Sequence, residues 1–415
     1  MQDFRKYAPV PPKGWNSWDV YGASVREDEV KRNAQYLAKY LQKYGYNYVT
    51  VDIQWYEPTA DSADYHNFAP LLMDQYARLI PDPIRFPSAK NGQGFKSLAD
   101  YVHSLGLKFG LHMMRGIPRQ AVYQDIPIKG THKTAREIAA NNICPWNSDM
   151  FGVNVALPEG QAYYNSVMDL YASWGVDFIK CDDIAYSRNL RDTHLAEVHA
   201  LRKAIDQTGR AMVLSLSPGP APLKHASFFQ QNANMWRITD DFWDQWELLL
   251  KMFDRANEWS PISRLGNWSD CDMLPLGHLA LRSVDGERYT RFTRAEQRTM
   301  LTLWSLLQSP LIIGSELPDL DEGTLALLTQ PDILEMDNEG LEKEQIYRDA
   351  QMVVWKSRTN KHHYTALFNL SEQELELNDS ILAKFKISDQ AIDVWSKEPV
   401  SGMQLGKHDV CLVKR

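Results

Sequence analysis

The sequence predicts an α/β protein: a (β/α)8 TIM barrel followed by a C-terminal antiparallel β-sandwich domain. First, short β-rich apolar runs alternate with longer segments of helical period over the first 338 residues, which is typical of a parallel sheet. Second, beyond about Asn338 the short apolar runs are separated by turn residues, and no helix is expected between them. We therefore assign residues 1–338 to the barrel and residues 339–415 to the small all-β domain.

Close to eight βα units can be read along the barrel segment, and eight such units predict a closed barrel. The first helix is expected to begin at a capping box formed by Ser24 and Glu27. A doubly wound sheet would have a glycine-rich first turn, which this sequence lacks. The candidate strands are Val10–Trp15, Tyr46–Ile53, Leu107–His112, Val176–Asp182, Ala211–Ser217, Asn234–Thr239, Ile262–Trp268 and Pro310–Gly314.

The net charge of the chain indicates which kinds of binding partner are unfavourable. The chain has 45 Lys and Arg against 53 Asp and Glu, a net charge of −8, which argues against a nucleic-acid or anionic-membrane surface. No apolar stretch approaches the 18 residues of a membrane span, and we expect a cytoplasmic protein. Four cysteines without close pairing predict neither a disulfide framework nor a zinc site. Whether the chain forms a homo-oligomer is left open.

Polar groups occur where several of the candidate strands end. They are Asp52, His112, Asp182, Ser217 and, just beyond the sixth strand, the pair Asp240 and Asp241. In a (β/α)8 barrel the active site lies at the C-terminal ends of the strands. The long segment Arg115–Gly160, rich in Pro, Asn and Gly, follows the third strand and is predicted to be an elaborated loop over the same mouth.

The strand ending Lys180-Cys181-Asp182 offers a candidate nucleophile. Residues two apart in a strand face the same side, so Lys180 and Asp182 should both point into the barrel mouth. A cation beside a carboxylate lowers its pKa, which suits a nucleophile or an electrostatic stabiliser. The alternative is an internal salt bridge that stabilises the barrel core.

A second carboxylate could come from the segment after the next strand but one, where Arg237 is followed by Asp240 and Asp241. A loop after a strand can place a general acid across the scissile bond from the nucleophile. Spacing alone does not say which aspartate serves. One of the two could instead be the N-cap of a helix starting near Phe242.

Seven segments, in this order and spacing, resemble the α-galactosidases of glycoside hydrolase family 27. These are retaining exo-glycosidases with a (β/α)8 barrel and a C-terminal antiparallel β-domain, and the resemblance spans most of the barrel. It implies a small carbohydrate substrate with a terminal sugar of galactose configuration, and no cofactor. The segments are Gly14–Trp18, Tyr46–Trp55, Gly106–Leu111, Trp174–Asp182, Trp236–Asp241, Asn267–Leu274 and Ala326–Asn338.

The resemblance also implies roles for individual residues. Asp182 is similar to the family's nucleophile, and the Arg-x-x-x-Asp spacing from Arg237 selects Asp241 as the acid/base. Retaining chemistry would place the two carboxyl groups about 5–5.5 Å apart. The other implied positions are Trp18, which stacks on the sugar; Lys180 and Arg237, which bind ring hydroxyls; His112, where the family often has a tyrosine; and Asp272 and Met273, which form the floor.

The first departure from the family is at the end of the second strand. The family commonly has two aspartates there, which bind the 4- and 6-hydroxyls of galactose, whereas this chain has Asp52 followed by Ile53. An unpaired hydroxyl buried against isoleucine costs roughly 1–3 kcal/mol. L-Arabinopyranose is the same ring without the CH2OH arm, so Ile53 favours β-L-arabinopyranosides. Alternatively, Ile53 faces the core and a group such as Gln54 binds the 6-hydroxyl.

The second departure is Ser217, at a place where α-galactosidases usually have a glutamate that binds the 2-hydroxyl. A serine there in the related α-N-acetylgalactosaminidases makes room for an acetamido group, so the two departures point to different sugars. We give Ile53 more weight, because N-acetylgalactosamine also has a 6-hydroxyl. An α-galactosidase, an α-N-acetylgalactosaminidase and a non-catalytic sugar-binding barrel are the alternatives. The histidines do not predict a metal site.

Overall fold

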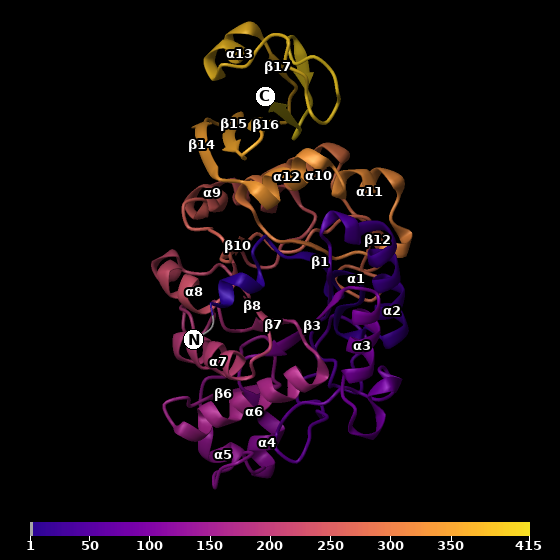
Figure 1. The fold of residues 1–415 in the computed structure, drawn as a ribbon, viewed down its shortest axis with the longest axis vertical. Helices are drawn as coiled ribbons and strands as arrows, with labels where there is room; N and C mark the ends of the chain where they lie inside the picture. The colour runs from indigo at the N-terminus through magenta and orange to yellow at the C-terminus, as the bar shows by residue number, and fades with distance from the viewer. Residues whose placement is uncertain (1–2) are drawn as a thin grey trace.

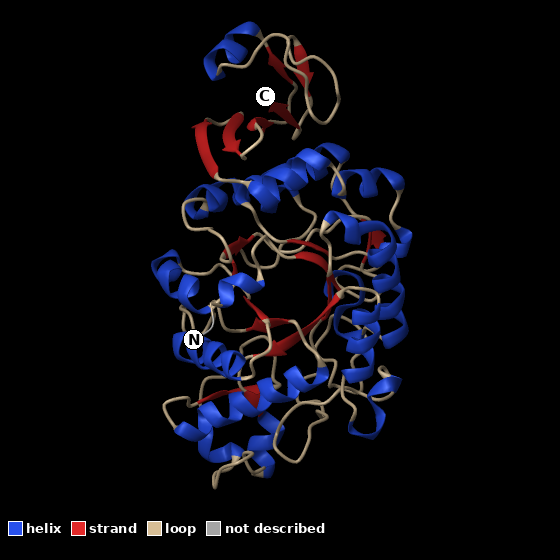
Figure 2. Cartoon of the chain, viewed as in Figure 1, coloured by secondary structure: helices blue, strands red, loops and turns tan. Residues whose placement is uncertain are grey.

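The structure is a computed structural model that describes residues 3–415. Its centre is a ring of eight parallel strands (Figure 2). They follow one another as β10-β9-β8-β7-β3-β2-β1-β13, and a parallel bridge between Leu274, just after β10, and Ile313 completes the ring. The predicted barrel is confirmed. The strands are β1 (Lys13–Asn16), β2 (Tyr48–Val51), β3 (Lys108–Met114), β7 (Phe178–Asp182), β8 (Val213–Leu216), β9 (Met235–Arg237), β10 (Trp268–Asp270) and β13 (Leu311–Ile313).

Helices surround the ring (Figure 1). Most lie in the connections between consecutive barrel strands, as βα alternation requires, while α11 and α12 follow β13, and their apolar residues belong to the main core cluster. Between β10 and β13 the chain also contains the short hairpin β11 (His278–Leu279) and β12 (Arg288–Tyr289). The helices are α1 (Trp18–Tyr21), α2 (Glu27–Tyr36), α3 (Lys96–Ser104), α6 (Pro158–Trp174), α7 (Leu195–Gln207), α8 (Ala226–Asn232), α9 (Trp246–Trp259), α10 (Arg294–Leu307), α11 (Glu322–Leu328) and α12 (Pro331–Glu339).

The N-terminal ends of the strands are closed by an apolar layer. Tyr48, Phe178, Val213, Met235 and Trp268 are the first residues of β2, β7, β8, β9 and β10 and form one buried cluster with Ala8. Polar residues such as Asp52 and Asp182 lie at or just beyond the opposite ends of the strands. The barrel is therefore sealed at the bottom, and chemistry is confined to the C-terminal face.

The helix that the Ser24 and Glu27 pair predicts is α2, and it begins later than this pair indicates. The hydroxyl of Ser24 donates to the carbonyl oxygen of Tyr21 at 2.7 Å and also accepts a hydrogen bond from Arg282, so it does not cap the helix. Helix α2 starts at Glu27, and the carboxylate of Glu29 accepts from the backbone N–H of Arg26 at 2.8 Å. The predicted capping box is therefore absent: only its glutamate half is found, two residues further along, because the N-cap Arg26 has no side-chain acceptor.

The seventh strand also begins later than the pattern predicts. Residues 262–267 form a turn that is closed by a bridge between Arg264 and Asn267, with Gly266 at a positive φ of 77°. Leu265 is exposed, so the apolar residues of this run are not a buried strand. Only Trp268 belongs to both the predicted and the observed strand.

The segment 115–160 is folded, not a plain loop. It contains a three-stranded sheet in the order β4-β6-β5, formed by Ile117–Pro118, Met150–Val153 and Ala139–Ala140. Two short helices, α4 (Arg119–Gln124) and α5 (Ala135–Ile138), complete it. It brings the stretch 141–149 to the barrel mouth, where Trp146 lines the cavity described below.

The C-terminal part is built on two antiparallel sheets, β14-β15-β16-β19 and β17-β18. It also contains a helix, α13 (Asp379–Phe385), which the all-β prediction did not anticipate; its N-cap Asn378 accepts from the backbone N–H of Ile381. The boundary at 338/339 stays a prediction. The strands are β14 (Glu342–Arg348), β15 (Met352–Arg358), β16 (His363–Asn369), β17 (Leu375–Leu377), β18 (Met403–Leu405) and β19 (Val410–Lys414).

The four-stranded sheet has two buried faces. Val353 and Trp355 belong to the large cluster that includes the barrel helices, whereas Met352 and Val354 belong to a separate cluster with the rest of the C-terminal part. This alternation follows from the two-residue period of a strand. Phe368 of β16 packs edge-on against Phe253 of α9 with ring centroids 5.0 Å apart, so the sheet lies directly on the barrel.

All four cysteines are free and buried, as their spacing predicts. None of the helices within residues 3–415 is both long and apolar enough to cross a membrane.

Candidate active site

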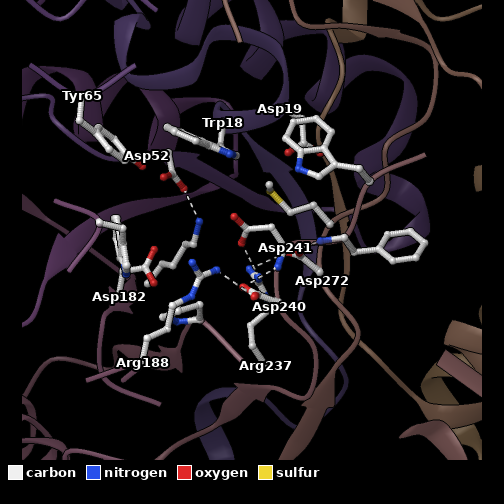
Figure 3. A pocket seen from close by; sticks show the side chains of 16 residues that line it. Trp18, Asp19, Asp52, Tyr65, Asp182, Arg188, Arg237, Asp240, Asp241 and Asp272 are labelled. Atoms are coloured by element: carbon white, nitrogen blue, oxygen red, sulfur yellow. Dashed lines mark hydrogen bonds and ion pairs between the residues drawn. The ribbon is translucent and has the colours of Figure 1, made fainter. Parts of the chain in front are cut away.

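A cavity of about 190 Å³ opens at the C-terminal ends of the barrel strands (Figure 3). Most of the side chains that the sequence singles out line it: Trp18, Asp52, Lys180, Asp182, Arg237, Asp241, Asp272 and Met273. These residues come from at least five different strands or the loops after them, which is how a barrel assembles a site.

Asp182 is the last residue of β7 and is held by two hydrogen bonds. His112, in the neighbouring strand β3, places its Nε2 3.3 Å from Oδ2 of Asp182, and the backbone N–H of Asp183 donates to Oδ1 at 3.1 Å. Burial alone would raise the pKa of Asp182. The hydrogen bond from His112 and the positive charges of Lys180 and Arg237 hold it well below its ordinary value, so Asp182 is a carboxylate.

Lys180 faces the same cavity, but its ammonium pairs with Asp52 rather than with Asp182. Its Nζ lies 2.7 Å from Oδ2 of Asp52. The backbone N–H of Ile53 and the side-chain amide of Asn16 also donate to the Asp52 carboxylate, at 2.8 and 2.7 Å. Burial raises the pKa of Asp52, but Lys180 and these hydrogen bonds lower it overall. Lys180 therefore acts on Asp182 through its charge, while its ion pair is with Asp52.

Arg237 connects two other carboxylates. Its Nη2 lies 2.6 Å from Oδ1 of Asp241, and its Nη1 lies 2.8 Å from Oδ1 of Asp272. Burial raises the pKa of Asp272 to about 7; Arg237 opposes the shift, and Asp241 adds to it. Asp241 is far more accessible, with 61% of its side chain exposed, so it can reach a ligand in the cavity.

Asp240 also lines the cavity, but its carboxylate pairs with Arg188 at 3.0 Å on the exposed rim. Neither aspartate caps a helix. Helix α9 begins only at Trp246, with Gln245 as its N-cap, and the backbone N–H of Phe242 donates to Asp272. The N-cap interpretation is therefore wrong.

Three of the predicted residues do not line this cavity. His112 is fully buried behind Asp182, where it contacts the carboxylate as described. Ser217 lines a smaller cavity of about 30 Å³ deeper in the barrel. Ile53 is 2% exposed and packs in the main hydrophobic cluster next to Asp52. Gln54 does not replace the missing acid at the surface of the cavity, because it is buried and its amide nitrogen donates to Asp149 at 3.1 Å.

Several lining residues were missed by the sequence analysis. They are Asp19, Tyr65, Trp146, Arg188, Pro218, Phe242 and Trp243. Tyr65, Trp146 and Arg188 lie on long connections whose path no local pattern specifies. Asp19 directly follows Trp18, and Trp243 lies two residues after Asp241. Closeness in sequence to these predicted residues was the only signal that could have identified them. Over residues 3–415, no group of three or more His, Cys, Asp or Glu side chains is arranged to bind a metal ion.

A family model described as α-galactosidase A matches residues 11–156 and 152–339, which is nearly the whole barrel segment. The chain belongs to this family, glycoside hydrolase family 27. This glycoside hydrolase is therefore an enzyme of the α-galactosidase type, and the non-catalytic sugar-binding alternative is set aside.

Among solved structures, this glycosidase is similar to a variant of the family 27 β-L-arabinopyranosidase of Geobacillus stearothermophilus in complex with arabinose. The TM-score is 0.95 and the identity 53%, with 99% of this chain and 98% of that chain covered. Among curated relatives, α-galactosidase 2 of Arabidopsis thaliana is 25% identical over 354 residues, covering 85% of this chain and 73% of that protein. The α-N-acetylgalactosaminidase of Gallus gallus is 22% identical over 438 residues, covering 98% and 91%.

Proposed function

We propose that this glycosidase is a retaining exo-glycosidase for terminal sugars of α-galactoside configuration and that it prefers β-L-arabinopyranosides. The observation that carries the proposal is one small cavity lined by an anionic Asp182 and by an accessible Asp241 that Arg237 holds. In Figure 3 both carboxyl groups are among the side chains that line the cavity, Asp241 beside Arg237 and Asp182 apart from them. A carboxylate that is favoured in its ionised form and a second, solvent-accessible carboxyl group suit double displacement.

In the proposed first step, an oxygen of Asp182 attacks the anomeric carbon, and the bond to the aglycone oxygen breaks. Asp241 donates its proton to that oxygen, so the aglycone leaves as an alcohol. In the second step, Asp241 takes a proton from water, the water oxygen bonds to the anomeric carbon, and Asp182 is released. Trp18 would stack on the sugar, while Asp52, Lys180 and Arg237 would bind its hydroxyls.

The preference for a pentose is supported by the surroundings of Asp52. Ile53 packs in the core and not on the cavity surface, so this position supplies no polar group for a 6-hydroxyl, and Gln54 is buried with its amide donating to Asp149. A buried hydroxyl without a partner costs roughly 1–3 kcal/mol. The similar enzyme of Geobacillus stearothermophilus is named a β-L-arabinopyranosidase, which agrees with this preference.

An α-N-acetylgalactosaminidase activity is the second candidate, because Ser217 stands where the family's α-galactosidases usually have a glutamate. The cavity beside Ser217 is about 30 Å³. That is room for roughly one or two water molecules, and an acetamido group would need more. We therefore rank this activity below the other two.

The test is to compare kcat/KM for the p-nitrophenyl glycosides of β-L-arabinopyranose, α-D-galactose and N-acetyl-α-D-galactosamine. We expect kcat/KM to be highest for the arabinopyranoside, lower for the galactoside and lowest for the N-acetylgalactosaminide. The first ratio should be roughly tenfold or more, because one unpaired hydroxyl or unaccommodated methylene costs at least that much. Faster cleavage of either hexoside would contradict the preference, and no cleavage of any of the three would contradict the proposed class of substrate.

Replacing Lys180 by methionine should change the pH profile of the enzyme. Lys180 helps to lower the pKa of Asp182, so its loss disfavours the carboxylate and raises that pKa. The nucleophile then becomes protonated at a higher pH, and the acid limb of the kcat/KM profile should move upward by roughly one to two pH units. Initial rates from pH 8 down to the lowest pH at which both proteins stay folded measure the shift. A lower plateau with the limb unmoved would mean that Lys180 only binds substrate.

A further inference from the structure

The loop that follows strand β2 brings a residue to the cavity that none of the family-like segments contains. Tyr65 lies between the segment ending at Trp55 and the helix α3, and its side chain lines the cavity beside Asp52 (Figure 3). Its ring stacks on Trp18, with ring centroids 5.9 Å apart and planes 24° apart. On its other side it packs against Trp146 at 5.8 Å. Three aromatic rings from three separate segments thus form one wall.

The backbone on both sides of Tyr65 is hydrogen-bonded to neighbouring segments, one after β1 and the other within residues 115–160. The carbonyl oxygen of Ser62 accepts from the backbone N–H of Ala23 at 2.9 Å, and the backbone N–H of Phe68 donates to the hydroxyl of Ser148 at 2.8 Å. The loop also lies so close to Gly22, which has a φ of 55°, that a Cβ there would come within 2.7 Å of the Ser62 oxygen. The aromatic wall is therefore fixed in place before a ligand binds.

The order of strands around the barrel indicates which part of a sugar this wall would face. Asp182 ends β7; β8, whose end is followed by Ser217, lies on one side of it, and β3 and β2 lie on the other. If Ser217 marks the C2 side of the ring, as the resemblance implies, Asp52 and Tyr65 lie on the side of C4 and C5. The exocyclic CH2OH arm of a hexose projects from C5.

We infer that Tyr65 is a specificity-determining residue that closes the C5 side of the sugar site and excludes a hydroxymethyl arm. This inference rests on the proposed function, because it concerns the same site and the same choice between a pentose and a hexose. The phenol adds a donor to the wall. Burial and the negative charges of Asp182 and Asp52 raise the pKa of Tyr65 well above its ordinary value, so the hydroxyl keeps its proton.

The test measures kcat/KM on the p-nitrophenyl β-L-arabinopyranoside and α-D-galactoside for the wild type, Tyr65→Ala, Tyr65→Leu and Tyr65→Phe. Removing the ring opens space for the arm, so Tyr65→Ala should raise the galactoside-to-arabinopyranoside ratio roughly tenfold or more. Tyr65→Phe keeps the ring and should leave the ratio within about twofold, even if both rates fall through loss of the phenol donor. Phe68→Ala, in the same loop but with its ring exposed, is the matched control and should change nothing.

Inhibition constants for free L-arabinose and D-galactose provide a second readout that does not depend on catalysis. An unchanged ratio in both Tyr65→Ala and Tyr65→Leu, with melting temperatures near the wild-type value, would overturn the inference. So would a Tyr65→Phe variant that shifts the ratio as far as alanine does. If Tyr65→Ala does not fold, the ratio measured for Tyr65→Leu decides the test. A wild type that prefers the galactoside contradicts the proposed preference instead, because the inference concerns only the change between variants.

Discussion

Replacing Asp182 by alanine is expected to lower kcat/KM by roughly 10⁴- to 10⁶-fold, the range seen when a covalent nucleophile or its partner is removed. The surroundings of Asp182 explain the size of this effect. His112 and the charges of Lys180 and Arg237 all stabilise a negative charge on Asp182, whereas Asp52, the other carboxylate beside Lys180, is tied up in an ion pair with it. The space left by the side chain can admit a small anion.

Azide or formate should restore activity to Asp182→Ala, and with azide the product should be the glycosyl azide of inverted configuration, because one displacement replaces two. NMR of the product anomer settles the configuration. Asp100→Ala, which removes an exposed carboxylate paired with Lys96 on α3, is the control and should behave as wild type. Substantial activity in Asp182→Ala without added anion, or rescue with retained configuration, would exclude Asp182 as the nucleophile.

Replacing Asp241 by alanine should give the second largest effect, and one that depends on the aglycone. Loss of a general acid costs roughly 10²- to 10⁴-fold. An aglycone with a high pKa needs the proton most, so arabinopyranosides of alcohols should lose more kcat/KM than the p-nitrophenyl glycoside does. Rates on p-nitrophenyl and methyl glycosides, measured side by side, give this difference.

In Asp241→Ala, azide should accelerate turnover of the activated substrate and give a glycosyl azide of retained configuration, since it attacks the enzyme-bound sugar from the face that water normally uses. Asp254→Ala, on the exposed side of α9 and paired with Arg348, is the matched control. Equal losses on both kinds of aglycone would contradict an acid/base role and leave Asp241 as a binding residue only.

The barrel could be predicted from the sequence because its signals are local. A strand such as Phe178–Asp182 is a short apolar run, and a parallel sheet requires it to be buried on both faces. The same period predicted that Lys180 and Asp182 share a face, and both line the cavity. The partner of Lys180 was not predictable in this way, because Asp52 comes from another strand 128 residues away.

The aromatic side of the cavity could not be read from the sequence. Tyr65 and Trp146 lie in connections without periodicity, and their positions depend on distant contacts such as the one between Phe68 and Ser148. Ile53 illustrates a related limit. The sequence shows that an apolar residue replaces an acid at this position. It does not show that the side chain of Ile53 packs in the core and not on the cavity surface, because that orientation depends on tertiary packing.

An apolar cluster closes the N-terminal end of the barrel, so ligands can reach the cavity only from the C-terminal end of the strands. The cluster is formed by Tyr48, Phe178, Val213, Met235 and Trp268. Substrate and products must therefore use the same open side of the cavity, whose lining includes Trp146 and Trp243. In the proposed mechanism the aglycone leaves before the covalent intermediate is hydrolysed, so the monosaccharide is the last product to be released. The free monosaccharide should consequently compete with substrate for the empty site. Its accumulation should therefore inhibit the enzyme competitively and lower the rate of hydrolysis.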